Sequence, residues 1–143
     1  QTDGERLAKV REAVGPGPLV YGDWNCGATT LDAIRVGRAA AHLDIMLEAP
    51  CATLEDCARV QSATGLPMKM DELAHDTASM LQAHRLGIMD AVALKLSKFG
   101  GLSATRRAAK LIRAASRMEH PPEAWRWSCG LGTRRGRNPA GDE

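Results

Sequence analysis

Aromatic side chains are scarce in this sequence of 143 residues, with one Tyr, one Phe and three Trp, or 3% in all. A buried core must therefore be built from aliphatic residues and methionine, and a hydrophobic fraction of 44% is enough for one globular domain. The four cysteines contain no C-x-x-C pair, and no histidine lies at zinc-finger spacing from them. We expect reduced thiols in a cytoplasmic protein.

The sequence also lacks long apolar runs and a strong net charge. No run approaches the length of about 18 residues that a membrane span needs, and no signal-peptide pattern is present. A net charge of +2 is too small to indicate a nucleic acid or an anionic membrane as partner. Glycine-rich motifs that bind nucleotide phosphates are absent as well. These absences argue against a nucleic acid, a membrane or a nucleotide as the partner of this sequence.

Short apolar runs alternate with helical patterns along the chain. The runs cover 18–25, 44–51, 66–72 and 91–99, and the helical patterns cover 2–15, 28–43, 53–65, 76–87 and 101–118. Such alternation predicts the α/β class, with parallel strands joined by right-handed helical crossovers. Helix caps are also predicted: Thr53 begins one helix, Gly65 ends it, and Asp76 begins the next.

A charged residue ends each apolar run. Asp23, Glu48, Asp71 and Lys95 follow one another at intervals of 25, 23 and 24 residues. In a (β/α)8 barrel this end of every strand faces the active site. Four such units predict about half of a TIM-type barrel, with three acids and a lysine around its mouth.

Three carboxylates at one mouth repel each other and require a cation. Hard oxygen ligands suit Mg²⁺, so Asp23, Glu48 and Asp71 are the candidate metal ligands and should converge on one point. Lys95 is the candidate base, because a cation and the neighbouring Lys69 and Lys98 would lower its pKa toward the range in which bases work. The set suits removal of a proton alpha to a carboxylate.

Two of these lysines have alternative interpretations. Lys69 either takes part in the site or only forms an ion pair with the acids. Lys98 lies on the other side of its run from Lys95 by strand alternation, so we expect it to diverge from the acids.

The motifs "DWN", "LEAPC", "PMKMDE" and "LKLSKFGG", in this order, resemble those of the enolase superfamily, in its muconate-lactonising-enzyme-like and mandelate racemase-like branch. The resemblance implies a barrel domain in which Asp23, Glu48 and Asp71 bind Mg²⁺ and Lys95 is a base. It implies accessory roles for Lys98, Asn25 and Glu72. The sequence around the motifs is most similar to that of the group of cis-3-hydroxy-L-proline dehydratases.

The resemblance implies a lyase that removes the α-proton of a hydroxyproline-like amino acid and expels its hydroxyl group. An epimerase or racemase of proline-type amino acids or betaines is the alternative. The substrate would be a small amino acid, and the parent enzyme would be a homo-oligomer.

The sequence departs from the family pattern in ways that predict a fragment. Residues 1–116 carry the partial barrel, whereas 117–143 lose all periodicity and predict an irregular tail, either frameshifted or disordered. An N-terminal capping domain, an early K-x-K motif and the last strands are missing. We therefore expect the chain alone to be a catalytically inactive half-barrel.

Overall fold

A computed structural model describes residues 2–119, with side chains as far as residue 114. It contains one parallel sheet in which the strands lie in chain order, β1-β2-β3-β4. The strands are β1 (Val20–Asp23), β2 (Ile45–Glu48), β3 (Met68–Met70) and β4 (Ala91–Val92). The predicted α/β class and parallel strand order are therefore confirmed.

Helices precede and follow each strand, as the sequence pattern indicates. They are α1 (Asp3–Val14), α2 (Thr30–Ala40), the 3₁₀ turn η1 (Ala41–Leu43), α3 (Leu54–Thr64), α4 (Thr77–Arg85), α5 (Leu96–Phe99) and α6 (Leu102–Glu119). The predicted caps are present: Thr53 accepts a hydrogen bond from the backbone of Asp56, Asp76 accepts one from Ser79, and Gly65 ends α3 in the left-handed conformation. Local capping chemistry thus defines where the helices begin and end.

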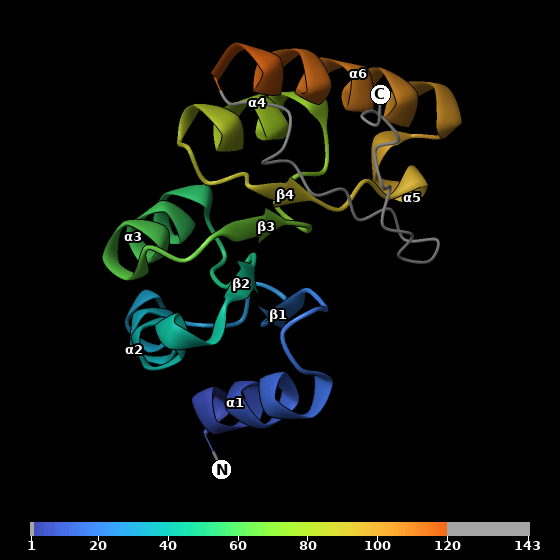
Figure 1. Cartoon of the computed structure of the whole chain (residues 1–143). Coiled ribbons are helices and arrows are strands. Elements are labelled where there is room, and N and C mark those ends of the chain that lie inside the picture. Colours follow the sequence, from blue (N-terminus) through green and yellow to red (C-terminus); the bar gives the residue numbers. More distant parts are fainter. Residues whose placement is uncertain (1, 120–143) are drawn as a thin grey trace.

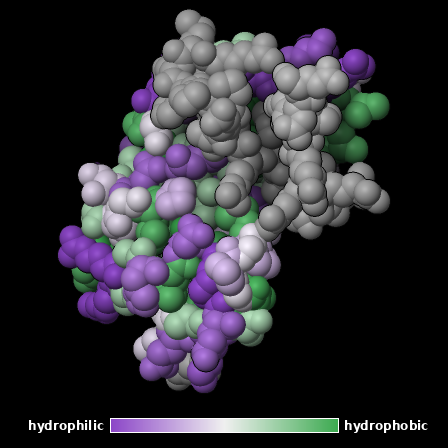
Figure 2. All heavy atoms as spheres, viewed as in Figure 1, coloured by the Kyte–Doolittle hydropathy of each residue, from purple (hydrophilic) through white to green (hydrophobic). Residues whose placement is uncertain are grey.

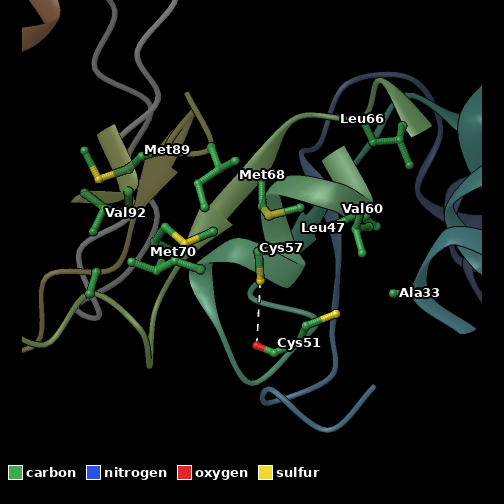
Figure 3. Packing of buried hydrophobic residues seen from close by; sticks show 14 of the residues in the cluster. Ala33, Leu47, Cys51, Cys57, Val60, Leu66, Met68, Met70, Met89 and Val92 are labelled. Atoms are coloured by element: carbon green, nitrogen blue, oxygen red, sulfur yellow. Dashed lines mark hydrogen bonds between the residues drawn. The ribbon is translucent and has the colours of Figure 1, made fainter. Parts of the chain in front are cut away.

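One face of the sheet packs against the helices. Strand side chains on this face include Ile45, Leu47, Met68 and Met70, and all four are at most 2% exposed. Figure 3 shows Met68 of β3 beside Cys57 of α3, whose thiol donates to the carbonyl oxygen of Cys51 at 3.7 Å. Aliphatic and sulfur-containing side chains therefore form the core, as the scarcity of aromatics requires.

The alternate residues of the strands lie on the opposite face, which corresponds to the inside of a barrel. On this face Lys69 of β3 contacts both Glu48 of β2 and the Tyr21 ring of β1. Figure 1 shows the helices arranged around the outside of the curved row of strands. The arrangement is that of successive units of a (β/α)8 barrel.

The fourth apolar run differs from its prediction. We expected a strand over 91–99, but β4 ends at Val92 and residues Leu96–Phe99 form the short helix α5. Gly100 and Gly101 then adopt positive φ angles of 76° and 105°, which lead the chain into α6. The expectation of a long strand was wrong because alternating apolar residues near a strand end also fit a helical turn.

Hydrophilic residues cover much of the outer surface. Figure 2 shows them over the lower part of the molecule, where α1 and α2 lie. Within residues 2–119, no helix has both the length and the apolar character needed to cross a membrane. Most of the predicted irregular tail, 117–143, and Cys129 lie outside the described residues.

Candidate active site at the carboxyl ends of the strands

The three predicted acids lie at the same edge of the sheet. Asp23 and Glu48 end β1 and β2 and are paired in the sheet register, and Asp71 follows β3 directly. Parallel strands point their carboxyl ends the same way, so the acids meet at the predicted barrel mouth. Glu48 and Asp71 are 3% and 4% exposed, and Asp23 is exposed.

Asp71 is bound by two lysines. Its Oδ2 accepts a hydrogen bond from Lys95, and its Oδ1 accepts one from Lys98 at 2.5 Å. Burial raises the pKa of Asp71, but these two ammonium groups outweigh burial and hold the pKa below its usual value. Asp71 is therefore an ionised carboxylate with a positive group on each oxygen.

Lys98 reaches Asp71 despite the expectation that it would diverge from the acids. Strand alternation does not apply to it, because Lys98 lies in the helical turn α5 rather than in a strand. Lys95 precedes that turn, so the turn brings both ammonium groups to one carboxylate. The expectation of divergence was wrong.

The pKa of Lys95 is raised in this structure, whereas the lowering expected from the sequence depends on a bound cation. Its hydrogen bond to Asp71 raises the pKa above the usual lysine value, with smaller contributions from Glu72 and Glu48. Burial is the second-largest influence and lowers the pKa, but the contact with Asp71 outweighs it. Lys95 in this arrangement is therefore a protonated ammonium.

Glu48 and Lys69 form a buried ion pair. Lys69 Nζ lies 2.8 Å from Glu48 Oε1, and the two side chains are 5% and 4% exposed. The same ammonium lies 4.0 Å from the centroid of the Tyr21 ring, a cation–π contact. Burial raises the pKa of Glu48, Lys69 lowers it, and the nearby Asp23 and Asp71 raise it further, with a net upward shift.

Asp23 is held by an asparagine. The backbone N–H of Asn25 donates to Asp23 Oδ1 at 2.8 Å, and Asn25 Nδ2 contacts both carboxylate oxygens at 2.9 and 3.0 Å. Asn25 Nδ2 also donates to Glu72 Oε1 at 3.3 Å. Asn25 adopts a positive φ of 48°, which turns the loop back toward its own strand end. Of the predicted accessory residues, Asn25 thus lies beside Asp23, and Glu72 lies beside Asn25.

The acids are paired separately rather than gathered around one point. Among the described residues, no three His, Cys, Asp or Glu side chains are arranged closely enough to hold a metal ion. The chemistry of the donor set nevertheless fits Mg²⁺: three carboxylates stand at adjacent strand ends, and Glu48 and Asp71 already bind positive ammonium groups. The assignment of Asp23, Glu48 and Asp71 as metal ligands stays a prediction.

Tyr21 was not among the predicted site residues, although it contacts one of them. Its ring covers the Lys69 ammonium, and its hydroxyl-bearing side chain is 42% exposed at the edge of the sheet. The available signal was its position two residues before Asp23, which places both on the same face of β1.

These features define a class of protein: parallel β/α units of the barrel type, with acids and lysines at the carboxyl ends of the strands. The family described as Enolase C-terminal domain-like matches residues 1–132. The chain therefore belongs to this family, and its relatives carry the TIM-barrel fold of the enolase superfamily.

Three similar proteins illustrate the relationship. A cis-3-hydroxy-L-proline dehydratase from Roseibium aggregatum is 33% identical over 111 residues, which cover 78% of this chain and 29% of that protein. A putative mandelate racemase/muconate lactonizing enzyme from Aspergillus oryzae has a TM-score of 0.77 at 30% identity, over 90% of this chain and 34% of that one. A racemase from Streptomyces coelicolor A3(2) with bound magnesium has a TM-score of 0.71 at 28% identity, over 80% and 33% of the two chains.

The chain thus spans about a third of the length of these relatives. Membership of the family implies enzymes of the lyase and racemase type. Solved relatives include one with bound magnesium, which makes Mg²⁺ the cation expected for the family.

Proposed function

We propose that this chain is the segment of an enolase-superfamily lyase that supplies the metal-binding carboxylates and one base. The reaction is removal of the proton alpha to a carboxylate, with dehydration of a cis-3-hydroxy-L-proline-like amino acid. The observation that carries the proposal is the contact of both Lys95 and Lys98 with Asp71, next to Glu48 and Asp23 at the neighbouring strand ends. Lysines and carboxylates thus share one edge of the sheet.

In this proposal Asp23, Glu48 and Asp71 would hold Mg²⁺. The bound ion would stabilise negative charge that develops on the substrate carboxylate. Asn25 orients Asp23 through its three hydrogen bonds, and Lys69 orients Glu48. Neither of these two orienting roles requires Lys95 or Lys98 to lose its positive charge.

Lys95 is the residue that moves the proton. Its contact with Asp71 favours the ammonium form, so occupation of Asp71 by another cation would release Lys95 and lower its pKa. The freed amine accepts the α-proton, the electron pair of the broken C–H bond forms the new double bond, and the β-hydroxyl group leaves as water with the proton that the Lys95 ammonium returns to it. Lys98, on the other oxygen of Asp71, keeps a positive charge beside the substrate.

A racemase or epimerase is the second candidate, supported by the similarity to the magnesium-bound racemase from Streptomyces coelicolor. The same base and the same cation serve both reactions, but a racemase returns a proton to the opposite face and loses no hydroxyl group. Product analysis separates the two: a dehydratase releases water and an imine, whereas a racemase gives the epimer.

A chimera tests the proposal, because the 143-residue chain spans only part of its relatives and we expect no turnover from it alone. Residues 2–114 replace the matching segment of the Roseibium dehydratase. We expect the folded chimera to dehydrate cis-3-hydroxy-L-proline with Mg²⁺, and Lys95→Met to reduce kcat by at least about 100-fold.

The control is Lys9→Met, which removes an equivalent charge from the exposed surface of α1. Activity should survive this change. A folded chimera that dehydrates equally well with and without Lys95 would show that the proposed base is wrong.

A further inference from the structure

A cavity of about 120 Å³ lies where the loop before α4 meets α5 and the first turns of α6 (Figure 1). Its polar lining comes from both sides: His75, Asp76 and Thr77 at the start of α4, and Lys98 and Arg107 from α5 and α6. A single water molecule needs only about 10–15 Å³ of such space, so the cavity admits a group of several heavy atoms. Lys98 is shared with the candidate active site, because it also contacts Asp71.

Arg107 brings to this cavity a positive charge that no carboxylate balances. Within the part of the chain that the structure describes, Arg107 makes no ion pair. Its own helix offers no partner, because the sequence contains no Asp or Glu between 102 and 118. A guanidinium carries five N–H donors in a planar fork that matches the oxygens of a phosphate or a carboxylate. Arg107 is therefore available to an anion.

Lys98 has donors to spare as well. An ammonium group carries three N–H donors, and Asp71 Oδ1 accepts one of them. The side chain of Lys98 is 23% exposed and lines the cavity while it holds Asp71. A second acceptor in the cavity would therefore complete the hydrogen bonding of Lys98 without breaking its existing contact.

Asp76 is the acid in the lining, and its charge is already in use. Its Oδ1 accepts hydrogen bonds from the backbone N–H of Ser79 at 2.7 Å and from Ser79 Oγ at 2.8 Å, which cap α4. Its Oδ2 lies 3.9 Å from His75 Nε2. Donors therefore outnumber free acceptors around the cavity, and the balance favours an anionic ligand over a cation.

We propose that this cavity is a binding pocket for the oxyanion group of a small molecule, a phosphate or a carboxylate, held by Arg107 and Lys98. The hydroxyl group of Thr77 is a further donor at the start of α4. Phe99 and Ala104 give the cavity apolar walls for the carbon atoms attached to that group. The inference goes beyond the proposed function and does not depend on it, because neither a metal nor a base takes part.

The test is titration of inorganic phosphate, and separately of acetate, into the full chain without divalent cations, followed by ¹H–¹⁵N NMR. We expect saturable shifts of the backbone amides of 75–77 and 98–107, with a dissociation constant on the order of 1 mM. Arg107→Met should weaken binding by roughly tenfold, the scale of hydrogen bonds to a charged group.

Arg106→Met is the matched control. It removes the same charge one position earlier in α6, at an exposed residue that does not line the cavity. Exposed charges are screened over about 8 Å at physiological ionic strength, so we expect this variant to change the affinity by less than about twofold. Equal weakening by the two substitutions would show that a diffuse positive surface, and not the cavity, attracts the anion.

A second pair of variants keeps the test decisive if Arg107→Met disturbs the fold. Ala104→Glu places a negative charge and a larger side chain in the cavity, whereas Ser103→Glu places the same charge at the neighbouring exposed position outside it. We expect Ala104→Glu to abolish saturable binding and Ser103→Glu to retain it. The spread of the amide signals in the same spectra shows whether each variant is folded.

The two anions distinguish the source of the ligand group. Tighter binding of phosphate than of acetate indicates a phosphate ester, and binding of acetate at least as tight indicates a carboxylate. Absence of saturable shifts with both anions, or shifts that Ala104→Glu leaves unchanged, would overturn the pocket. Such a result would leave the metal site of the proposed function untouched, since no divalent cation is present in the experiment.

Discussion

Asp71 combines deep burial with two positive partners, which makes it the residue on which the charge balance of the mouth depends. We predict that Asp71→Asn lowers the free energy of unfolding at pH 7 by about 1–3 kcal/mol, because hydrogen bonds to a charged carboxylate are lost. Urea unfolding followed by circular dichroism measures this change. Glu12→Gln, at an exposed position of α1, should leave the free energy of unfolding nearly unchanged.

The same carboxylate predicts a dependence of stability on pH. The pKa of Asp71 is lower in the folded state than in the unfolded chain, where it is about 3.9. Its contribution is therefore complete well above that value and is lost as the pH falls through the lower, folded-state pKa. Asp71→Asn should lose less stability than the unmodified chain in this acid range. Parallel loss of stability in both proteins would contradict the assignment.

Cysteine reactivity gives a prediction at the same scale. Burial raises the pKa of the Cys57 thiol to about 12 and also raises the pKa of Cys26. The two thiols differ in accessibility, because Cys57 is 0% exposed and Cys26 is half-buried. Alkylation requires an accessible thiolate. Iodoacetamide at pH 8 should therefore modify Cys26 before Cys57, as measured by peptide mass mapping over time. Equal rates at the two cysteines would contradict the packing of α3 on the sheet.

At the scale of elements, one arginine joins α1 to the sheet. Arg11 donates to the carbonyl oxygens of Leu43 at 2.8 Å, Gly15 at 3.1 Å and Pro18 at 2.9 Å, and it also contacts that of Asp44. These carbonyls lie at the end of α1 and in the turns before β1 and β2. Arg11 therefore satisfies backbone acceptors from two connections at once, the one before β1 and the one before β2.

We predict that Arg11→Met lowers the free energy of unfolding by about 2 kcal/mol, because the partly buried carbonyls of Leu43 and Gly15 lose their donor. Arg6→Met is the matched control, since Arg6 makes an exposed ion pair with Asp3 at 3.1 Å that contributes little. Chemical denaturation of both variants measures the difference. An equal loss in the two would show that α1 does not depend on Arg11.

Local signals explain which elements the sequence predicts well. The caps at Thr53, Gly65 and Asp76 depend on residues only a few positions away, and the structure contains all three. The predicted strand over 91–99 is wrong because the alternation of apolar residues continues from β4 into the helical turn α5. Contacts between elements are harder to predict. The spacing of the acids and lysines predicts that they lie at strand ends, but it does not predict which lysine contacts which acid.

At the scale of the whole molecule, the edges of the sheet matter. In the described part of the chain, β1 and β4 each have a single neighbouring strand. Large apolar side chains lie exposed beside β1, including Val14, Leu19 and Tyr21 at 43%, 38% and 42%. Unpaired strand edges with exposed apolar residues favour association between chains.

We predict that the isolated chain self-associates and that Leu19→Lys, which places a charge beside the β1 edge, reduces this association. Sedimentation velocity over a range of protein concentrations measures it. Leu31→Lys introduces the same charge on α2, at a position that is 64% exposed, and should have little effect. A chain that remains monomeric at all concentrations would contradict the prediction.

The central claim is that the acids of three adjacent strands act together as one metal site. Calorimetric titration of Mg²⁺ into the full chain tests it most directly, with Asp23→Asn, Glu48→Gln and Asp71→Asn as variants and Glu12→Gln as control. We predict one Mg²⁺ per chain and an affinity that falls at least about tenfold in each of the three variants, or about 1.4 kcal/mol, but not in the control. Absence of binding, or binding that none of the three substitutions weakens, would contradict the claim.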